Sequence, residues 1–408
     1  TTITNAVSFL NTGTLALGSV LGTQTYTGGL TTTSVVGIVT LKGTINTTNT
    51  AMTLGAITLG ADTTLNTNAT TTAGDLTLGA VTLAGYTLTL QTGTGAGTSA
   101  ADVNGTTVSG TGTLALQNIG GTASFSGAVS PATLTVPNTV VNVALTGSTG
   151  TITNAVTFLN TGTLTLGASG GAGTQTYTGG LNTVSVGGVV TLKGTLNTTN
   201  TAMTFGAITL GADTILTLGS GSLSFTGTVN SDGTARTLST TNSTTTSFAD
   251  VVGGSSALSS LTISTASMSA TTIRLTGALS VTNSSTGTPS TITGVISGTT
   301  LTKAGAGTLT LSGANDYSGA TTINAGALVL TSTGTLGNQL SLLTISSATL
   351  DLQRALTVGS LSMSGSSPAI TNTTGSSSLI VSGTSTLANA ITTSGNQTYT
   401  GAVTLGAT

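Results

Sequence analysis

The chain has 408 residues and a formal net charge of −2, from six Lys and Arg and eight acidic residues, with no Cys and no His. Such a composition gives no basic surface for nucleic acid, no thiolate for a disulfide or a metal, and no His to activate a nucleophile. Only 3% of the residues are charged, so neutral Thr, Ser and Gly must form much of the surface, while 37% hydrophobic residues are enough for a core.

Short segments in which apolar residues alternate with Thr or Ala recur from the start of the chain, first at 13–17, 39–41 and 57–59. A period of two is typical of strands with one buried face, and no segment shows helical periodicity. Gly, Asn and Ser separate these segments, as turns require. The pattern predicts an all-β chain with no substantial helix, and no apolar run is long enough for a membrane-spanning helix. Further segments of this kind are 81–83, 87–90 and 309–311.

A long stretch of the chain is duplicated, because residues 2–65 return as residues 151–216 with a length change of two residues before the second tyrosine. Near-identical blocks in tandem favour a solenoid over a sandwich or a barrel, since each coil can stack on the one before it. We therefore predict a parallel β-solenoid, a right-handed β-helix, with roughly 16–20 coils of about 20–25 residues each.

The repeats divide the chain into four predicted blocks. The second block begins with the duplicate of the first, and the last stops inside a repeat. We expect the solenoid to continue beyond this sequence, because neither end resembles a polar cap. The four blocks are residues 1–148, 149–300, 301–337 and 338–408.

Four of the five tyrosines lie in one pattern, amide–x–Tyr–hydroxyl–Gly. The rings could form a ladder that stacks on glycans, or each could be a half-buried residue that closes a corner of a coil with its hydroxyl in water. Recurrence once per module, beside turn-forming residues, favours the corner. These structural candidates are Tyr26, Tyr177, Tyr317, Tyr399, Gly28, Gly179, Gly319 and Gly401.

Charged residues are few and scattered. Lys42 and Asp62 recur at matching positions of the second copy, as solvated turn residues would. Asp351 and Arg354 are close enough for an exposed ion pair. No Asp-x-Asp loop supplies calcium ligands, although ligands from different coils could still meet. We predict no catalytic, metal or cofactor site, and we expect the chain not to be an enzyme.

One segment carries a family resemblance. Within residues 301–337, Gly-Thr-Leu-Thr-Leu at 307–311 is followed by Asn-Asp-Tyr-Ser-Gly at 315–319 and Gly-Ala-Leu-Val-Leu at 326–330. This order resembles the autotransporter-associated β-strand repeat, also called the passenger-associated transport repeat. Asp316 stands where that family more often has a small hydroxyl or neutral residue.

The same order of motifs recurs, with looser spacing, at residues 13–41 and 162–192. The duplicated blocks therefore resemble diverged relatives of the same module, similar to those of giant haemagglutinin-like adhesins.

The resemblance implies a secreted stalk or adhesive passenger at the cell surface of a diderm bacterium, folding as a β-helix outside the cell. The expected partners are glycans, host or neighbouring-cell surfaces, or identical subunits joined end to end; nucleic acid is not expected. No catalytic residue belongs to the repeat. An ice-binding solenoid with Thr ranks such as Thr23, Thr25 and Thr27, and a polysaccharide-active enzyme, remain as alternatives.

Overall fold

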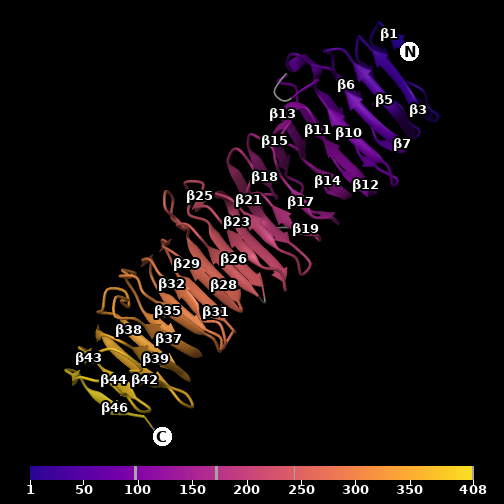
Figure 1. Ribbon diagram of the computed structural model, residues 1–408. Helices are drawn as coiled ribbons and strands as arrows, with labels where there is room; N and C mark the ends of the chain where they lie inside the picture. The colour runs from indigo at the N-terminus through magenta and orange to yellow at the C-terminus, as the bar shows by residue number, and fades with distance from the viewer. Residues whose placement is uncertain (96–98, 171–172, 243, 407–408) are drawn as a thin grey trace. The chain divides into compact units, whose positions relative to one another are not determined.

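A computed structural model describes residues 1–95, 99–170, 173–242 and 244–406. They form a parallel β-solenoid of about 18 coils, in which each strand pairs with strands one coil away (Figure 1). The helical content of this part is one 3₁₀ turn, Thr72–Gly74, and no helix in it is long and apolar enough to cross a membrane. The predicted all-β parallel solenoid is confirmed. The right-handed winding of the coils and the four block boundaries stay predictions.

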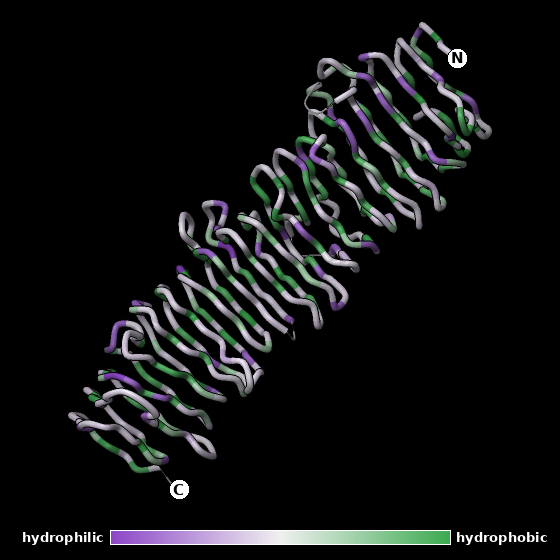
Figure 2. The backbone as a smooth tube through the Cα atoms, viewed as in Figure 1, coloured by the Kyte–Doolittle hydropathy of each residue, from purple (hydrophilic) through white to green (hydrophobic). Residues whose placement is uncertain are grey.

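The strands form because every second side chain is apolar. In β5 (Val39–Thr47) buried and half-buried residues alternate without a break, and β21 (Val190–Asn197) repeats this pattern in the second copy. Figure 2 shows the same alternation of apolar and neutral residues along most strands. Inward Leu, Ile, Val and Phe side chains of successive coils stack into the core, and the parallel ladder satisfies the backbone groups between coils.

The chain forms two compact units, Thr1–Gly206 and Ala207–Thr408. In the first unit each coil contributes to three columns of strands, and long strands such as β5 bend at a corner and serve two columns. In the first coils, the N-terminal parts of β3, β5 and β7 form the first column and their C-terminal parts form the second. The third column consists of β2, β4, β6 and β8. The strands of this unit are β1 (Thr2–Ile3), β2 (Val7–Ser8), β3 (Leu15–Tyr26), β4 (Leu30–Thr31), β5, β6 (Met52–Leu54), β7 (Ile57–Asn66), β8 (Leu76–Leu78), β9 (Val81–Thr82), β10 (Thr87–Gln91), β11 (Val103–Gly105), β12 (Val108–Leu116), β13 (Ile119–Phe125), β14 (Val129–Thr135), β15 (Val140–Leu145), β16 (Gly150–Ile152), β17 (Val156–Thr157), β18 (Leu164–Leu166), β19 (Thr174–Tyr177), β20 (Leu181–Asn182), β21 and β22 (Met203–Phe205).

The second unit continues the same design. One ladder follows the order β24-β27-β29-β32-β35-β37-β39-β42, and another runs from β26 through β28, β31, β34, β36, β38, β41 and β44 to β46. In its core, Phe225 stacks on Phe248 with ring centroids 4.8 Å apart. Its strands are β23 (Ile208–Gly219), β24 (Leu223–Phe225), β25 (Val229–Ser231), β26 (Thr237–Asn242), β27 (Thr245–Phe248), β28 (Ser260–Thr265), β29 (Ser267–Ala270), β30 (Ile273–Arg274), β31 (Leu279–Asn283), β32 (Ser290–Ile292), β33 (Ile296–Ser297), β34 (Leu301–Ala304), β35 (Thr308–Leu311), β36 (Thr321–Ile323), β37 (Gly326–Leu330), β38 (Leu342–Ser346), β39 (Ala348–Leu352), β40 (Ala355–Val358), β41 (Ser360–Ser364), β42 (Ala369–Thr371), β43 (Ser378–Val381), β44 (Ser385–Leu387), β45 (Gln397–Tyr399) and β46 (Val403–Leu405).

Coil length varies along the chain. Asp75 and Asp102, which lie one above the other, are 27 residues apart, whereas Ser346 and Ser364 are 18 residues apart. The extra residues are accommodated at the corners, outside the ladders. The strand stack is therefore regular while the corners differ from coil to coil.

The duplicated block does not return to the same column. Tyr26 ends the second-column part of β3. Its counterpart Tyr177 pairs with Ile152 in β16, and β16 lies against the first-column end of β14, where the N–H of Thr151 donates to Ser130 Oγ (3.0 Å). The second copy is therefore displaced by one of the three columns, and equivalent outward residues of the two copies face different sides of the solenoid.

Candidate functional site

In β3, β19 and β45 the tyrosine motif places a glutamine and a tyrosine two residues apart on the same face of a strand, whereas Asn315 and Tyr317 lie between β35 and β36. Tyr26, Tyr177 and Tyr317 are 2%, 1% and 1% exposed, while Tyr399 is half-buried. The prediction of half-buried rings with hydroxyls in water was therefore wrong for the first three. In the first two copies the strand period of two places the amide beside the ring inside the coil, where it takes the place of water as the acceptor for the hydroxyl.

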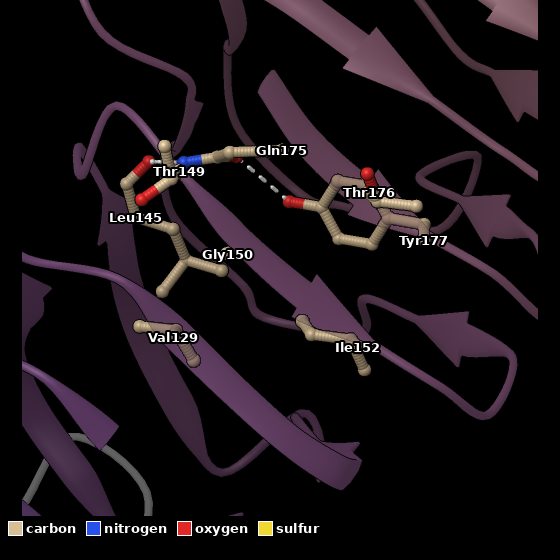
Figure 3. A pocket seen from close by; sticks show the side chains of 8 residues that line it. All are labelled: Val129, Leu145, Thr149, Gly150, Ile152, Gln175, Thr176 and Tyr177. Atoms are coloured by element: carbon tan, nitrogen blue, oxygen red, sulfur yellow. Dashed lines mark hydrogen bonds between the residues drawn. The ribbon is translucent and has the colours of Figure 1, made fainter. Parts of the chain in front are cut away.

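The second copy shows this arrangement most fully (Figure 3). The Tyr177 hydroxyl donates to Gln175 Oε1 (3.1 Å), and Gln175 Nε2 donates to the carbonyl oxygens of Leu145 and Gly147 (both 2.8 Å). Burial raises the pKa of the Tyr177 hydroxyl, so it remains a neutral donor. The neighbouring cavity has only about 10 Å³ accessible to water, too little for any ligand larger than a single water molecule.

The same pair recurs with variations. Tyr26 donates to Gln24 Oε1, as Tyr399 does to Gln397 Oε1 (both 3.1 Å). In the third copy the Tyr317 hydroxyl instead shares a hydrogen bond with Thr321 Oγ1 (2.5 Å). The inward amides and hydroxyls thus bond to groups of the chain itself. This placement favours the structural interpretation of the tyrosines over a glycan-stacking ladder.

The motif glycines serve close packing between coils. A Cβ on Gly28 would lie 2.4 Å from the backbone nitrogen of Ala6, and one on Gly179 would lie 2.3 Å from that of Ala155. Gly319 and Gly401 approach backbone carbonyl oxygens of the preceding coil in the same way. The left-handed residue expected at this corner is the next one in the first two copies, where Gly29 and Gly180 have φ of 109° and 110°.

Several aspartates connect successive coils. Asp62 Oδ1 accepts the N–H of Thr87 (2.8 Å) one coil later, and its counterpart Asp213 accepts the N–H of Thr237 (2.9 Å). Asp75, Asp102 and Asp351 accept a backbone N–H from the next coil in the same way. These carboxylates therefore have a structural partner, and in the described ranges no group of three His, Cys, Asp or Glu could hold a metal ion.

The expected pair of Asp351 and Arg354 does not form. Asp351 is 7% exposed, and its Oδ2 accepts hydrogen bonds from Gln353 and Thr373, whereas Arg354 donates to carbonyl oxygens. Among the residues the structure describes, an ion pair forms instead between Asp232 and Arg236 (2.9 Å). The hydrogen bond from Arg236 lowers the pKa of the Asp232 carboxyl.

Lys303 is a buried cation that sequence reasoning missed. Its side chain is fully buried, and Nζ donates to the carbonyl oxygens of Ala304 (2.8 Å), Gly305 (2.8 Å) and Ala325 (3.1 Å). Loss of solvent lowers the pKa of the ammonium group to about 8. The sequence did contain a signal for this burial. Lys303 follows the inward-facing Leu301 by two residues, so the alternation of the strand places its side chain on the inward face as well.

An open groove of about 510 Å³ lies on the outer face of the first unit, where the second column passes from β14 to β17. No charged side chain lines it, and its lining includes both short residues such as Ala115 and Ala155 and the longer Gln117 and Leu159. Gln91 Nε2 donates to Gln117 Oε1 (2.8 Å), which orients the amide beside the groove. No sequence motif marks this groove, since its lining comes from several successive coils. The other lining residues are Thr89, Leu116, Thr133, Leu134, Thr135, Val136, Pro137 and Thr157.

The fold and these sites define a structural repeat protein in which the buried tyrosines and Lys303 hydrogen-bond to groups of the chain itself. Residues 301–330, which include Lys303 and Tyr317, match the family model of the passenger-associated transport repeat. No curated protein and no solved structure matches the chain. The match and the solenoid together fit an autotransporter passenger-like repeat protein.

Proposed function

We propose that this chain is a non-enzymatic structural and adhesive solenoid of a secreted protein at the surface of a diderm bacterium. The observation that carries the proposal is the matched repeat within the ladder itself. Leu301 pairs with Thr321 and Leu309 with Leu328, so the repeat forms ordinary coils and is not an appended module. The repeat family is associated with secreted autotransporter passengers, which supports the surface location.

In this proposal the groove at β14 and β17 binds a neutral glycan. Thr hydroxyls and the Gln117 amide can hydrogen-bond sugar hydroxyls, while Ala115, Ala155 and Leu159 offer apolar contacts to the C–H faces of a sugar ring. A volume of about 510 Å³ is within the range of small-ligand sites. The absence of charged lining residues disfavours a sulfated or otherwise anionic glycan.

The chain supplies a matched pair of variants for the groove. Gly-Thr-Leu-Ala-Leu occurs at 13–17 and again at 112–116, with Ala16 outside the groove and Ala115 in it. Ala115→Phe should fill the groove and reduce binding to an array of neutral oligosaccharides at least tenfold. Ala16→Phe should leave that binding unchanged.

Two further outcomes test this proposal. Equal binding by the two variants, or binding of sulfated oligosaccharides alone, would contradict the groove as a neutral-glycan site. Release of new reducing ends from a neutral polysaccharide by the purified chain would contradict the non-enzymatic role. For the location, the protein expressed in its own host should be accessible to antibody on intact cells, and detection only after lysis would exclude the surface.

The ice-binding alternative requires a flat face of aligned threonines. Thr23 and Thr25 belong to the second column, while the corresponding Thr174 and Thr176 lie on the strand that stacks on the first. The displacement between the two copies therefore counts against one regular Thr face. A thermal-hysteresis assay without activity would retire this alternative.

A further inference from the structure

The first coils of the solenoid expose an apolar loop. Gly18 pairs with Lys42 and Thr23 with Thr44, so residues 19–22 together oppose the single residue Gly43 and loop out of the ladder. At the end of the loop Val20 is 64% exposed and Leu21 is 100% exposed. We call Val20 and Leu21 the apolar finger. Two adjacent large aliphatic residues with this exposure have no role in the core.

The same coils also carry an open hollow, whose lining is mainly apolar and includes Gly37, Thr58 and Thr82. It has a volume of about 280 Å³ and lies at the corner that precedes β5, β7 and β9. Val36 and Ile38 form its wall at 79% and 61% exposure, Ala56 and Ala80 are short, and Ile57 is buried beneath it. We call these five residues the corner hollow. No charged side chain lines it.

The hollow is large enough for the finger and offers it apolar contacts from Val36, Ile38 and Ile57. A cavity of about 150 Å³ holds a benzene-sized group, so about 280 Å³ suits two aliphatic side chains such as those of Val20 and Leu21. The finger does not fill the hollow of its own chain, because Leu21 is fully exposed. The finger is therefore free to contact another molecule.

In the second copy of the duplicated block, both features are altered. In the second copy, the segment between Gly167 and Gly173 contains only Ala, Ser and Gly, and Gly187 stands where the first copy has Val36. Most of the surrounding block is unchanged, as at 40–44 and 191–195. Thus the copy that lacks the finger also lacks one wall of the hollow, which is expected if the two surfaces serve one contact.

We propose that the apolar finger of one molecule docks into the corner hollow of a second copy of this chain. The contact is heterologous, because two different surfaces meet, and each bound molecule keeps one unused finger or hollow. Such a contact does not close on itself unless the rotation between copies forms a ring, so it extends side by side into chains of molecules. This association uses the sides of the coils and does not require their ends.

A complementation experiment tests the heterologous contact with the 408-residue chain. The finger variant is Val20→Ser/Leu21→Ser, and the hollow variant is Ala56→Gln/Ala80→Gln, which places longer side chains at two exposed positions. Sedimentation velocity would be measured between roughly 1 µM and 1 mM, the range expected for a small interface. Wild type should form dimers and larger species, and each variant alone should remain monomeric.

An equimolar mixture of the two variants should form dimers and nothing larger, since it has one intact finger and one intact hollow per pair. Leu340→Ser removes an aliphatic side chain of 72% exposure from the second unit and should associate as wild type does. Circular dichroism should show all variants folded, because the changed residues are exposed. A monomeric wild type, a mixture that stays monomeric while wild type associates, or an equal loss in Leu340→Ser would overturn the proposal.

Discussion

At the scale of single residues, the core of this solenoid contains polar groups whose partners come from the chain itself. The Tyr177 hydroxyl has an amide as its acceptor, and the Lys303 ammonium has three carbonyl oxygens. A buried polar group without such partners would be costly, so these contacts restrict which side chains the inward positions accept. Tyr177 and Lys303 are therefore positions of structural constraint in this chain.

Lys303 should make stability depend on pH. Its folded-state pKa is about 8 and its ordinary value is 10.5, so between these values the unfolded chain binds a proton that the folded chain does not. The free energy of unfolding must therefore rise with pH in this window, and it should gain about 2 kcal/mol between roughly pH 7.5 and 9.5.

Lys303→Met should lack this gain. Denaturant unfolding of wild type and variant at several pH values in the window would measure it, and the difference between the two proteins cancels the other titrating groups. If the free energy of unfolding changed with pH in the same way in both proteins, burial would not lower the pKa of Lys303 in the folded state, and the prediction would be contradicted.

At the scale of the strand and its corners, the spacing between coils decides where glycine is required. Gly13 and Gly37 lie one above the other at the corner before β3 and β5. A Cβ on Gly37 would lie 2.5 Å from the backbone of Gly13, whereas a Cβ on Gly13 would meet nothing within 4 Å. The two glycines face the same gap but differ in what an added methyl group would contact.

This difference predicts unequal effects for the same substitution. Gly37→Ala should lower the free energy of unfolding by about 2–4 kcal/mol, because backbone atoms of the previous coil must move. Gly13→Ala should change it by less than about 0.5 kcal/mol. Denaturant titration of both variants would measure the effects, and similar losses would contradict close stacking as the reason for glycine at this corner.

Much of the fold was predictable from alternation and duplication. The pattern of β5 specifies a strand with one buried face, and the return of residues 2–65 specifies stacked coils. The parity that buries Leu301 also buries Lys303, so that site was within reach of the same reasoning.

The column in which each tyrosine lies, the groove and the burial of the tyrosines could not be predicted from the spacing of motifs. Tyr26 and Tyr177 have almost the same neighbours in sequence but lie in different columns, because the coils between the two copies have unequal lengths. The groove at β14 and β17 is lined by residues from several successive coils, so no motif marks it. The burial of Tyr26 and Tyr177 required knowing that the amide oxygen two residues earlier accepts the hydrogen bond of the hydroxyl.

At the scale of the whole molecule, each coil contacts mainly the coil before it and the coil after it, so whole coils should be removable. Val103 pairs with Ala123, and the N–H of Thr122 bonds to Asp102 across 20 residues. Deleting residues 104–123 joins Val103 to Ser124, the residue that already stacks on Asn104, and restores the inward and outward parity of the following strands.

This deletion should keep the far-ultraviolet circular dichroism per residue and a cooperative thermal transition, with a modest loss of melting temperature from the missing coil. Deleting the ten residues 104–113 removes only part of a coil, so Val103 would be followed by a segment from another column and the ladder would be interrupted. We expect that shorter deletion to lose the cooperative transition. If the ten-residue deletion were the better tolerated of the two, the stability of this chain would not be set by register between neighbouring coils.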